Sequence, residues 1–219
     1  MIKILLFDLD GTLVDTENDI ADALNYSLKY CGLPTLTQSQ INAAIGNGFE
    51  KLIERCLPSD KKNFQAQVSQ VFKAYYLDHC VIKSKPYSGV LPLLKKLQPL
   101  KLAILSNKAE KYCRVILEEL NLTNFFLEVI GGDTFPTKKP DPMGLNFLLN
   151  QFKLQPHEAI MIGDSVPDIA VGHALGVDTI GITAGIGNTE QLTQSKPTHL
   201  ISSFSELEGL LKQEYAFSF

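Results

Sequence analysis

The chain has 219 residues, 45% of them hydrophobic, which suffices for one large domain or for a core with a smaller insert. Its net charge of −4 argues against nucleic acid or an anionic membrane as the main partner, because both favour a basic surface. The four cysteines are scattered without metal-binding spacing and no apolar run approaches the roughly 20 residues of a membrane span, so we expect a cytoplasmic protein with reduced thiols.

The first predicted strand, Ile4–Phe7, ends in two carboxylates, Asp8 and Asp10, before a turn at Gly11. Residues two apart in an extended chain face the same way. Such a pair of carboxylates repels unless one is protonated or a positive charge lies between them. This pair is the first candidate functional feature of the chain.

The long interval before the next strand has mostly helical patterns. Apolar residues recur with helical spacing within Ile20–Cys31 and Phe49–Cys56. Thr37 with Gln40 predicts a capping box, and Ser59 predicts the N-cap of a long helix. The residues of that helix expected to face inward are Phe64, Val68, Val71, Phe72 and Tyr75.

This helical interval is far longer than a crossover between parallel strands requires, which is about a dozen residues. We therefore predict an inserted α-helical cap domain over residues 16–82, with the core domain formed by residues 1–15 and 83–219. Ser88, in "KPYSGVLPLLKKL", is expected to cap the helix that leads into the second strand of the core.

The rest of the chain alternates strands with helices, which predicts a parallel sheet. The later predicted strands are Leu102–Leu105, Leu127–Ile130, Ala159–Ile162, Val177–Ile180 and His199–Ile201. The predicted helices between and after them are Ala109–Leu120, Met143–Phe152, Asp168–Leu175 and Ser205–Lys212. The predicted fold class is α/β, a doubly wound, Rossmann-like parallel sheet with the helical cap inserted.

Polar residues follow several of these strands, at the edge where doubly wound sheets bind ligands. They are Asp8 and Asp10 after the first strand, Ser106 and Asn107 after the second, and Asp164, Ser165 and Asp168 after the fourth. The lysines of "PTKKPDP" precede that fourth strand. Each residue alone has a structural explanation, as a helix cap, a turn residue or a solvated lysine. Their convergence on one edge favours a functional site.

The residue types at this edge suggest a reaction. Several carboxylates without a His/Cys set are suited to a hard cation, and Mg²⁺ takes a few carboxylates together with substrate phosphate. The backbone N–H groups of Gly11 and Thr12 are candidate anion donors, and Ser106 would add a hydroxyl at a helix start. With a lysine as counter-charge, this set describes a phosphoryl-transfer site.

The motifs "DLDGTLVDT", "LSN", "KKP" and "GDSVPD", in that order, resemble the four motifs of the haloacid dehalogenase superfamily in its phosphatase branch. The resemblance spans the predicted core, and the helical insert resembles the cap of that family. It implies that Asp8 is a nucleophile that becomes an aspartyl-phosphate. It implies that Asp10 is the general acid for the leaving alcohol and then the general base for water.

The same resemblance implies that Ser106 and the Asn107 backbone bind the phosphoryl oxygens. Lys139, directly before Pro140, matches the lysine of the family better than Lys138 does. We expect Lys139 to act in catalysis and in substrate binding, with Lys138 as its solvated neighbour.

The metal implied by the resemblance is Mg²⁺. Its expected ligands are Asp8, the Asp10 carbonyl and Asp164, with Asp168 acting directly or through water. The dehalogenases of the superfamily lack an Asp at the position of Asp10, which argues against carbon–halogen cleavage.

The cap stretch "IGNGFEKLIERCL", with "KPYSGV" and "SNKAE", resembles phosphoglycolate phosphatases. The resemblance implies hydrolysis of a small phosphomonoester, with 2-phosphoglycolate as the favoured substrate. Asn47 and Gly48 are expected to bind it, since "GNG" permits close backbone approach. Phe49, Lys51 and Arg55 are further candidates, although an ordinary helix start with solvated side chains explains them as well.

Other functions stay open at this point. A mutase of the β-phosphoglucomutase type would use the same Asp8 but return the phosphoryl group to a sugar, and a pyrophosphatase or nucleotidase would use the same core. A receiver-like signalling module is disfavoured by the large cap and the full set of acid, base and lysine groups. The expected partner is a small phosphomonoester, with no nucleic acid and no membrane, and the expected state is a monomer or homodimer.

Overall fold

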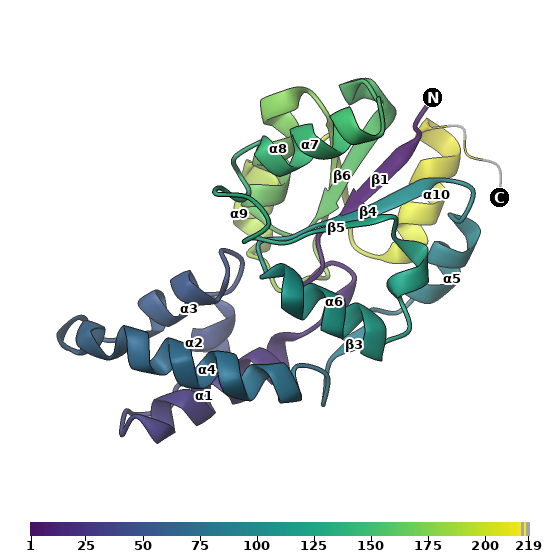
Figure 1. Cartoon of the computed structure of the whole chain (residues 1–219). Helices are drawn as coiled ribbons and strands as arrows, with labels where there is room; N and C mark the ends of the chain where they lie inside the picture. Colours follow the sequence, from purple (N-terminus) through teal and green to yellow (C-terminus); the bar gives the residue numbers. More distant parts are fainter. Residues whose placement is uncertain (216, 218–219) are drawn as a thin grey trace.

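The computed structural model describes residues 1–215 and 217, so three residues of the predicted core segment, 216, 218 and 219, lie outside the described residues. Six parallel strands form the central sheet in the order β5-β4-β1-β6-β7-β8 (Figure 1). They are β1 (Ile4–Phe7), β4 (Lys101–Leu105), β5 (Glu128–Ile130), β6 (Ala159–Gly163), β7 (Asp178–Ile182) and β8 (His199–Ile201). The predicted doubly wound parallel sheet is confirmed, with strands at the predicted places to within two residues.

Helices cover both faces of this sheet, which explains why its strands are continuous apolar runs. Ile4 and Leu6 of β1 belong to the apolar cluster on one face, and Leu5 and Phe7 belong to the cluster on the other. The first face is covered by α7 (Met143–Gln151) and α8 (Val166–Leu175). The second is covered by α5 (Val90–Lys96), α6 (Glu110–Glu119) and α10 (Phe204–Glu214).

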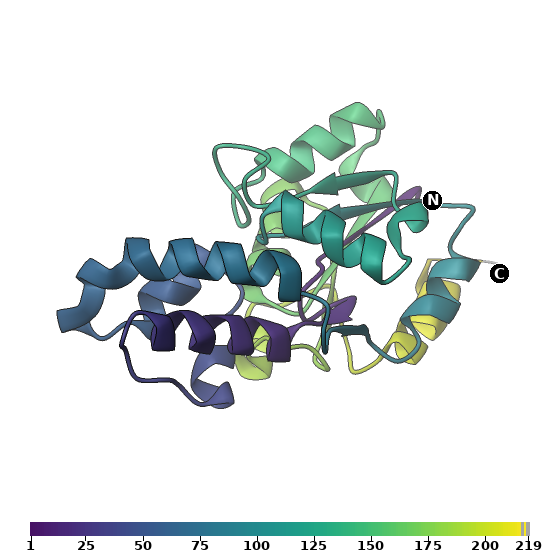
Figure 2. The ribbon, with the colours of Figure 1, turned by 60° about the horizontal axis from the view of Figure 1, so that its bottom comes forward.

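A helical unit projects from the core at the edge where the strands end, as Figures 1 and 2 show from two directions. It consists of α1 (Glu17–Tyr30), α2 (Gln38–Asn42), α3 (Phe49–Cys56), η1 (Ser59–Phe64) and α4 (Gln65–His79). The chain enters it through β2 (Val14–Asp15) and leaves through β3 (Lys85–Pro86), and these two short strands pair antiparallel. The helical unit is therefore joined to the core by two adjacent segments.

Local sequence signals for this unit are partly confirmed. Thr37 and Gln40 form the predicted capping box of α2. Ser59 is not the cap of the long helix, because Ser59–Phe64 forms a separate 3-10 turn before α4 begins. On α4, Val68 and Phe72 are buried as predicted, whereas Tyr75 is only partly buried and Tyr76, which was not predicted, is buried.

Two further differences concern connections in the core. Ser88 does not cap α5; Gly89 does, in a left-handed conformation with φ of 88° that brings it against Phe204. The sequence also did not predict α9 (Thr189–Gln194) or the short turns η2 (Thr123–Phe125) and η3 (Pro156–Glu158). These elements are short, and their apolar patterns are correspondingly weak.

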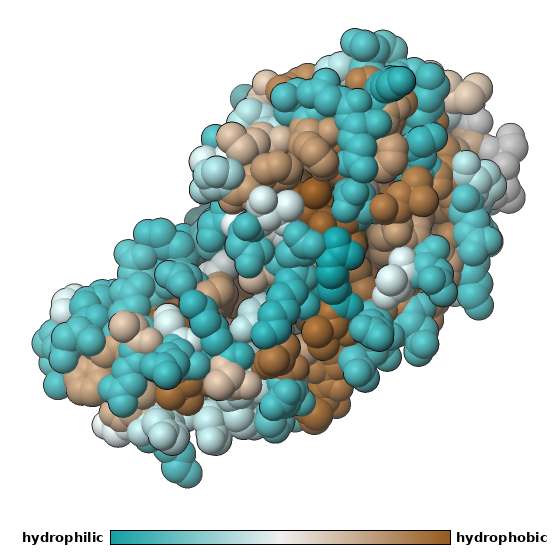
Figure 3. Space-filling model, in the orientation of Figure 1, coloured by the Kyte–Doolittle hydropathy of each residue, from teal (hydrophilic) through white to brown (hydrophobic). Residues whose placement is uncertain are grey.

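The visible surface of the protein carries both hydrophilic and hydrophobic side chains (Figure 3). Figure 3 shows hydrophilic side chains over most of the visible face of the helical unit, with hydrophobic residues showing in patches over the core. No helix within the described part of the chain has the length and apolar character needed to cross a membrane.

Candidate active site

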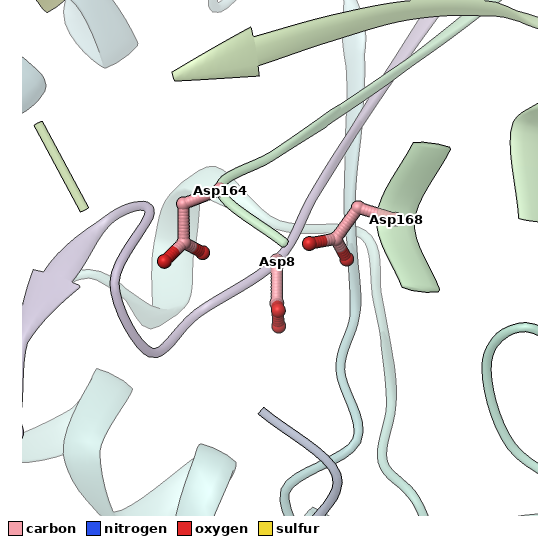
Figure 4. Close-up of side chains that lie close together, drawn as sticks. All are labelled: Asp8, Asp164 and Asp168. Atoms are coloured by element: carbon pink, nitrogen blue, oxygen red, sulfur yellow. The ribbon is translucent and has the colours of Figure 1, made fainter. Parts of the chain in front are cut away.

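Three buried carboxylates meet at the carboxyl edge of the sheet. Asp8 follows β1, Asp164 follows β6, and Asp168 lies in the first turn of α8. Each offers one oxygen, and these oxygens all lie within 4.8 Å of one another. Figure 4 shows the three side chains converging from these separate segments. The sheet order causes this convergence, because β1 and β6 are neighbours and their ends therefore coincide.

The Asp8 carboxylate is held by the chain that follows it and by a lysine. Its Oδ1 accepts a hydrogen bond of 2.7 Å from the Leu9 N–H, and its Oδ2 lies 3.2 Å from Lys139 Nζ. Burial raises the pKa of Asp8, Lys139 opposes that rise, and the nearby Asp168 adds to it. The Asp8 carboxylate is thus held in a fixed orientation, but the positive charge of Lys139 does not fully offset its burial and the nearby Asp168.

Lys139 supplies the only lysine charge inside the acid cluster among the residues that the structure describes. It is 4% exposed and pairs with Asp168 Oδ1 at 2.5 Å as well as with Asp8. Burial lowers the pKa of Lys139, but the two carboxylates together raise it by more than burial lowers it. The pKa of Lys139 therefore lies above its ordinary value. Lys138 lies outside the cluster and is only partly buried. The geometry therefore favours Lys139 over Lys138, as expected.

Asp164 is the most crowded of the acids. Its Oδ1 accepts from the Thr12 hydroxyl at 2.9 Å, and its Oδ2 accepts from the Gly187 N–H at 2.9 Å. Burial, followed by repulsion from Asp168 and Asp8, raises its pKa to about 8. Gly11 packs directly against it, since a Cβ there would lie 2.2 Å from Asp164 Oδ2. The turn after β1 therefore supports the third acid of the cluster.

Replacing Gly11 by Ala should disturb this packing. Gly11 has φ of 79° and an obstructed Cβ position, whereas Gly32 has φ of 69° with nothing within 4 Å. We expect Gly32→Ala to cost only the left-handed strain, roughly 1 kcal/mol. Gly11→Ala should cost about 1–3 kcal/mol more, because a neighbour must also move. Urea unfolding of both variants measures the difference, and equal losses would contradict the crowding argument.

Asp168 has both oxygens occupied. Its Oδ1 accepts from Lys139, and its Oδ2 accepts from the N–H and the hydroxyl of Ser165 at 3.0 and 2.5 Å. With Ser165 it forms the capping box of α8, so the helix start fixes its position. These contacts favour a role for Asp168 in holding Lys139. They also favour contact between Asp168 and a cation through water rather than directly.

The acid cluster fits a hard divalent cation. Three buried carboxylates with one ammonium leave an excess of negative charge, and this excess adds to the effect of burial in raising the pKa of Asp164 to about 8. Oxygen donors of this kind, with neither cysteine nor histidine among them, are the set that Mg²⁺ takes in proteins.

Asp10 faces the cavity from the same turn but belongs to a different network. Lys108 Nζ donates to both of its oxygens at 2.9 Å, and the Thr16 hydroxyl donates to Oδ1 at 2.8 Å. Lys108 is 8% exposed and also donates to the Tyr76 hydroxyl at 2.8 Å. The two acids that look equivalent in the sequence are thus paired with different lysines, Asp8 with Lys139 and Asp10 with Lys108.

Ser106 and Asn107 lie after β4 and are both buried. The Ser106 hydroxyl accepts from the Lys108 N–H at 3.3 Å and lowers the pKa of the nearby Asp8. It is not at a helix start, because α6 begins only at Glu110. The Asn107 amide donates to the carbonyls of Lys139 and Gly46, at 3.0 and 3.2 Å. Asn107 therefore connects the core to the helical unit.

The turn amides that were expected to bind an anion are used inside the turn. The Gly11 N–H donates to the Val14 carbonyl and the Thr12 N–H donates to the Leu9 carbonyl, at 3.0 and 3.3 Å. The Thr12 hydroxyl is committed to Asp164. The expectation that Gly11 and Thr12 offer free donors is therefore wrong, and their visible role is to build the acid cluster.

A cavity of about 60 Å³ lies between the acids and the helical unit. Its walls from the helical unit include Gly48, Phe49, Leu52, Phe72 and Tyr76. Of the cap residues proposed from sequence, Gly48 and Phe49 line this cavity and Asn47 does not. Asn47 accepts from Arg55, and Lys51 pairs with Glu54, so the structure does not place these side chains at the cavity.

Sequence reasoning missed Lys108, Tyr76 and the loop that carries Gly187. Lys108 lies within "SNKAE", two residues after Ser106, but it was not identified as a buried charge. The glycines of "AGIGN" were a signal that a loop approaches something closely, and a Cβ at Gly187 would lie 2.0 Å from the Asp164 carbonyl oxygen. Tyr76 had no such signal.

Known proteins share both this sequence and this fold. The family model described as haloacid dehalogenase-like hydrolase matches residues 5–182. A phosphoglycolate phosphatase of Vibrio cholerae is 36% identical over 205 residues, covering 90% of this chain and 91% of the relative. One of Vibrio vulnificus strain CMCP6 is 34% identical over 215 residues, covering 94% of each.

A solved structure agrees with these relatives. The crystal structure of a predicted phosphoglycolate phosphatase from Haemophilus somnus 129PT matches with a TM-score of 0.90 and 30% identity, over 95% of this chain and 97% of the other. The chain belongs to the haloacid dehalogenase-like hydrolase family, since that model covers most of its length. Within the family it is a phosphomonoester hydrolase, similar over nearly its whole length to phosphoglycolate phosphatases.

Proposed function

We propose that this protein hydrolyses 2-phosphoglycolate to glycolate and phosphate through an aspartyl-phosphate on Asp8, with Mg²⁺ as its cofactor. The observation that carries the proposal is the position of Asp8, oriented by the Leu9 N–H and paired with Lys139 beside two further acids. The named relatives support the choice of substrate, since they are phosphoglycolate phosphatases.

In the first step, an Asp8 oxygen attacks phosphorus and the bond from phosphorus to the bridging oxygen breaks. Asp10, which faces the same cavity, gives a proton to that oxygen as glycolate leaves. Ser106 donates to the phosphoryl group, and Lys139 offsets its charge. Asp10 is held at its Oδ1 by the Thr16 hydroxyl, so its position does not depend on the substrate.

In the second step, Asp10 takes a proton from water, and that water attacks phosphorus. The bond between phosphorus and the Asp8 oxygen breaks, which returns the carboxylate and releases phosphate. Such proton transfers contribute typically 10²–10⁴-fold to a rate. Mg²⁺ would be held by Asp8, the Asp10 carbonyl and Asp164, with Asp168 through water, and when bound it lowers the repulsion between Asp8 and the phosphoryl oxygens.

The size of the cavity supports a small substrate. Its volume of about 60 Å³ is well below the roughly 300–1,000 Å³ of sites for drug-sized ligands. Phe49 and Phe72 stack with ring centroids 5.9 Å apart and form part of its wall. This enclosure favours a two-carbon leaving group over a nucleotide.

The acid cluster predicts how Mg²⁺ should affect stability. An acid whose pKa is raised on folding, here Asp164 to about 8, contributes stability below its ordinary value near 4 and loses it as pH rises through 8. Mg²⁺ takes the place of the proton, so its stabilising effect should grow between pH 6 and 9. At about 100 times its Kd it should add about 2.7 kcal/mol, a rise in Tm of roughly 5–10 °C.

Thermal scans with and without Mg²⁺ at several pH values measure this effect. Asp164→Asn should remove most of the Mg²⁺-dependent rise in Tm, whereas Asp22→Asn, at an exposed ion pair with Lys83, should keep it. An equal rise in both variants would place the cation elsewhere.

The proposed function is tested by phosphate release from 2-phosphoglycolate, sugar phosphates, nucleotides and pyrophosphate, each with and without Mg²⁺. We expect the highest kcat/KM for 2-phosphoglycolate and no turnover after chelation. Interconversion of sugar phosphate isomers without phosphate release would show a mutase instead. A stable phosphoprotein without turnover would show a signalling module.

For the setting of this reaction we propose the cytoplasm. All four cysteines are free, and burial raises the pKa of the Cys113 thiol, which keeps it protonated and unreactive. Free thiols of this kind are typical of a reducing compartment.

A further inference from the structure

Lys108 and Tyr76 form a polar pair inside the otherwise apolar part of the cavity. Lys108 and Tyr76 both line the cavity, and each is nearly inaccessible to solvent, at 8% and 2% exposure. The surrounding walls are apolar, made by Ile20, Ile45, Leu52 and Phe72. A charge in such surroundings interacts strongly with an opposite charge, because little water screens it.

The Tyr76 hydroxyl has an unused donor. It accepts a hydrogen bond from Lys108 Nζ, and no acceptor for its own proton lies within hydrogen-bond distance among the residues that the structure describes. Burial raises the pKa of this phenol, so it remains a donor. A buried hydroxyl proton without an acceptor is costly, and an acceptor on a ligand would satisfy it.

Lys108 can share its ammonium with a second carboxylate. Two of its three N–H groups point to the two oxygens of Asp10, and the third points to Tyr76. If one of the first two turns to a ligand, Asp10 still accepts from the other and from Thr16. An anionic acceptor beside Tyr76 and Lys108 therefore needs no rearrangement of the backbone.

The position of this pair matches one part of the substrate. Asp10 is proposed to protonate the bridging oxygen, and Lys108 lies one hydrogen bond beyond Asp10. In 2-phosphoglycolate one methylene separates the bridging oxygen from the carboxylate. The carboxylate of the leaving group therefore falls on the side of the cavity where Lys108 and Tyr76 are found.

We propose that Lys108 and Tyr76 bind the carboxylate of the leaving group and determine the preference for an acidic phosphomonoester. This inference rests on the proposed phosphatase function and assigns to it two specificity-determining residues. Lys108 supplies the charge, and the Tyr76 hydroxyl supplies a directed hydrogen bond. Lys139 has no part in this, because it is committed to Asp8 and Asp168.

The test compares 2-phosphoglycolate with its carboxamide analogue, in which a neutral amide replaces the carboxylate. The ratio of the two kcat/KM values is measured for each variant on one preparation, so a loss of folded protein cancels. We expect a ratio of at least about 30 for the unmodified protein and a ratio near 1 for Lys108→Met. Lys111→Met removes an exposed lysine from the same segment and should leave the ratio unchanged.

Tyr76→Phe provides an independent variant. Loss of one hydrogen bond to a charged group should lower the ratio by about 10-fold. Tyr75→Phe is the matched control, since Tyr75 stacks on Tyr26 and His79 outside the cavity and should leave the ratio unchanged. Each of these two variants removes one hydroxyl from the same helix, and of the two residues only Tyr76 lines the cavity.

The outcomes separate this inference from the function on which it rests. If Lys108→Met lowers kcat/KM equally for both substrates, Lys108 only positions Asp10 and the inference is overturned while the phosphatase stands. A ratio near 1 in the unmodified protein would likewise overturn the inference while the phosphatase function stands. If the unmodified protein releases phosphate from neither substrate, the proposed function fails and the inference fails with it.

Discussion

Asp8→Asn should abolish phosphate release from 2-phosphoglycolate while leaving the fold intact. Asn cannot form an acyl phosphate, so the first covalent step is lost, and the expected loss in kcat is on the order of 10⁴–10⁶-fold. The variant should not be less stable in the absence of cation. The pKa of Asp8 is raised by burial and by Asp168, so removing its charge relieves repulsion, and Lys139 keeps its pair with Asp168.

The control is Asp22→Asn, which removes an exposed carboxylate that pairs with Lys83. It should keep full activity. Acid-quenched samples taken during turnover should contain phosphoprotein for the unmodified chain and none for Asp8→Asn. Wild-type turnover of an aryl phosphate by Asp8→Asn would refute the proposed nucleophile.

The arrangement of the sheet could be predicted from the sequence because its strands are strong local signals. Ile4–Phe7 and Ala159–Ile162 are continuous apolar runs bounded by polar residues, and helices cover both faces of the sheet. The signals that failed were single residues at helix starts. Ser59 and Ser88 are good caps in principle, but a 3-10 turn and a left-handed glycine were formed there instead. Tertiary packing decides such positions, and a single sequence does not record it.

The acid cluster was also accessible from the sequence, because carboxyl ends of neighbouring parallel strands meet. Asp8, Asp164 and Asp168 were all named, and the structure brings them together. What the sequence could not reveal was how each acid is paired. The partner of Asp10 is Lys108, which is 98 residues away, and its neighbour Tyr76 comes from the helical unit. Pairings between separate parts of the chain depend on how they pack.

The same limit explains the turn after β1. Gly11 and Thr12 have the residue types of an anion-binding turn, and only the structure shows that their N–H groups are used internally. We therefore expect their contribution to catalysis to be indirect. Thr12 and the space left by Gly11 hold Asp164 in place, so this turn connects the first motif of the chain to the last.

Asp10→Asn should separate the two chemical steps. Asn keeps an oxygen that accepts from Thr16 and Lys108, so two of the three hydrogen bonds to this side chain survive, but it can neither give nor take the proton. With 2-phosphoglycolate, whose alkoxide is a poor leaving group, kcat should fall about 10²–10⁴-fold. With p-nitrophenyl phosphate, the phenolate leaves without a proton, so Asp8 should still become phosphorylated.

The resulting aspartyl-phosphate should then persist, because no base activates water. Stopped-flow measurement of Asp10→Asn should show a burst of one nitrophenolate per active site followed by slow turnover. Asp8→Asn should show no burst, and the variant with both changes should behave like Asp8→Asn. If Asp10→Asn loses activity on both substrates equally and shows no burst, Asp10 does not act on the leaving group. The contrast between the two variants would then show that the two carboxylates of the first motif do not divide the chemistry as proposed, despite their different lysine partners.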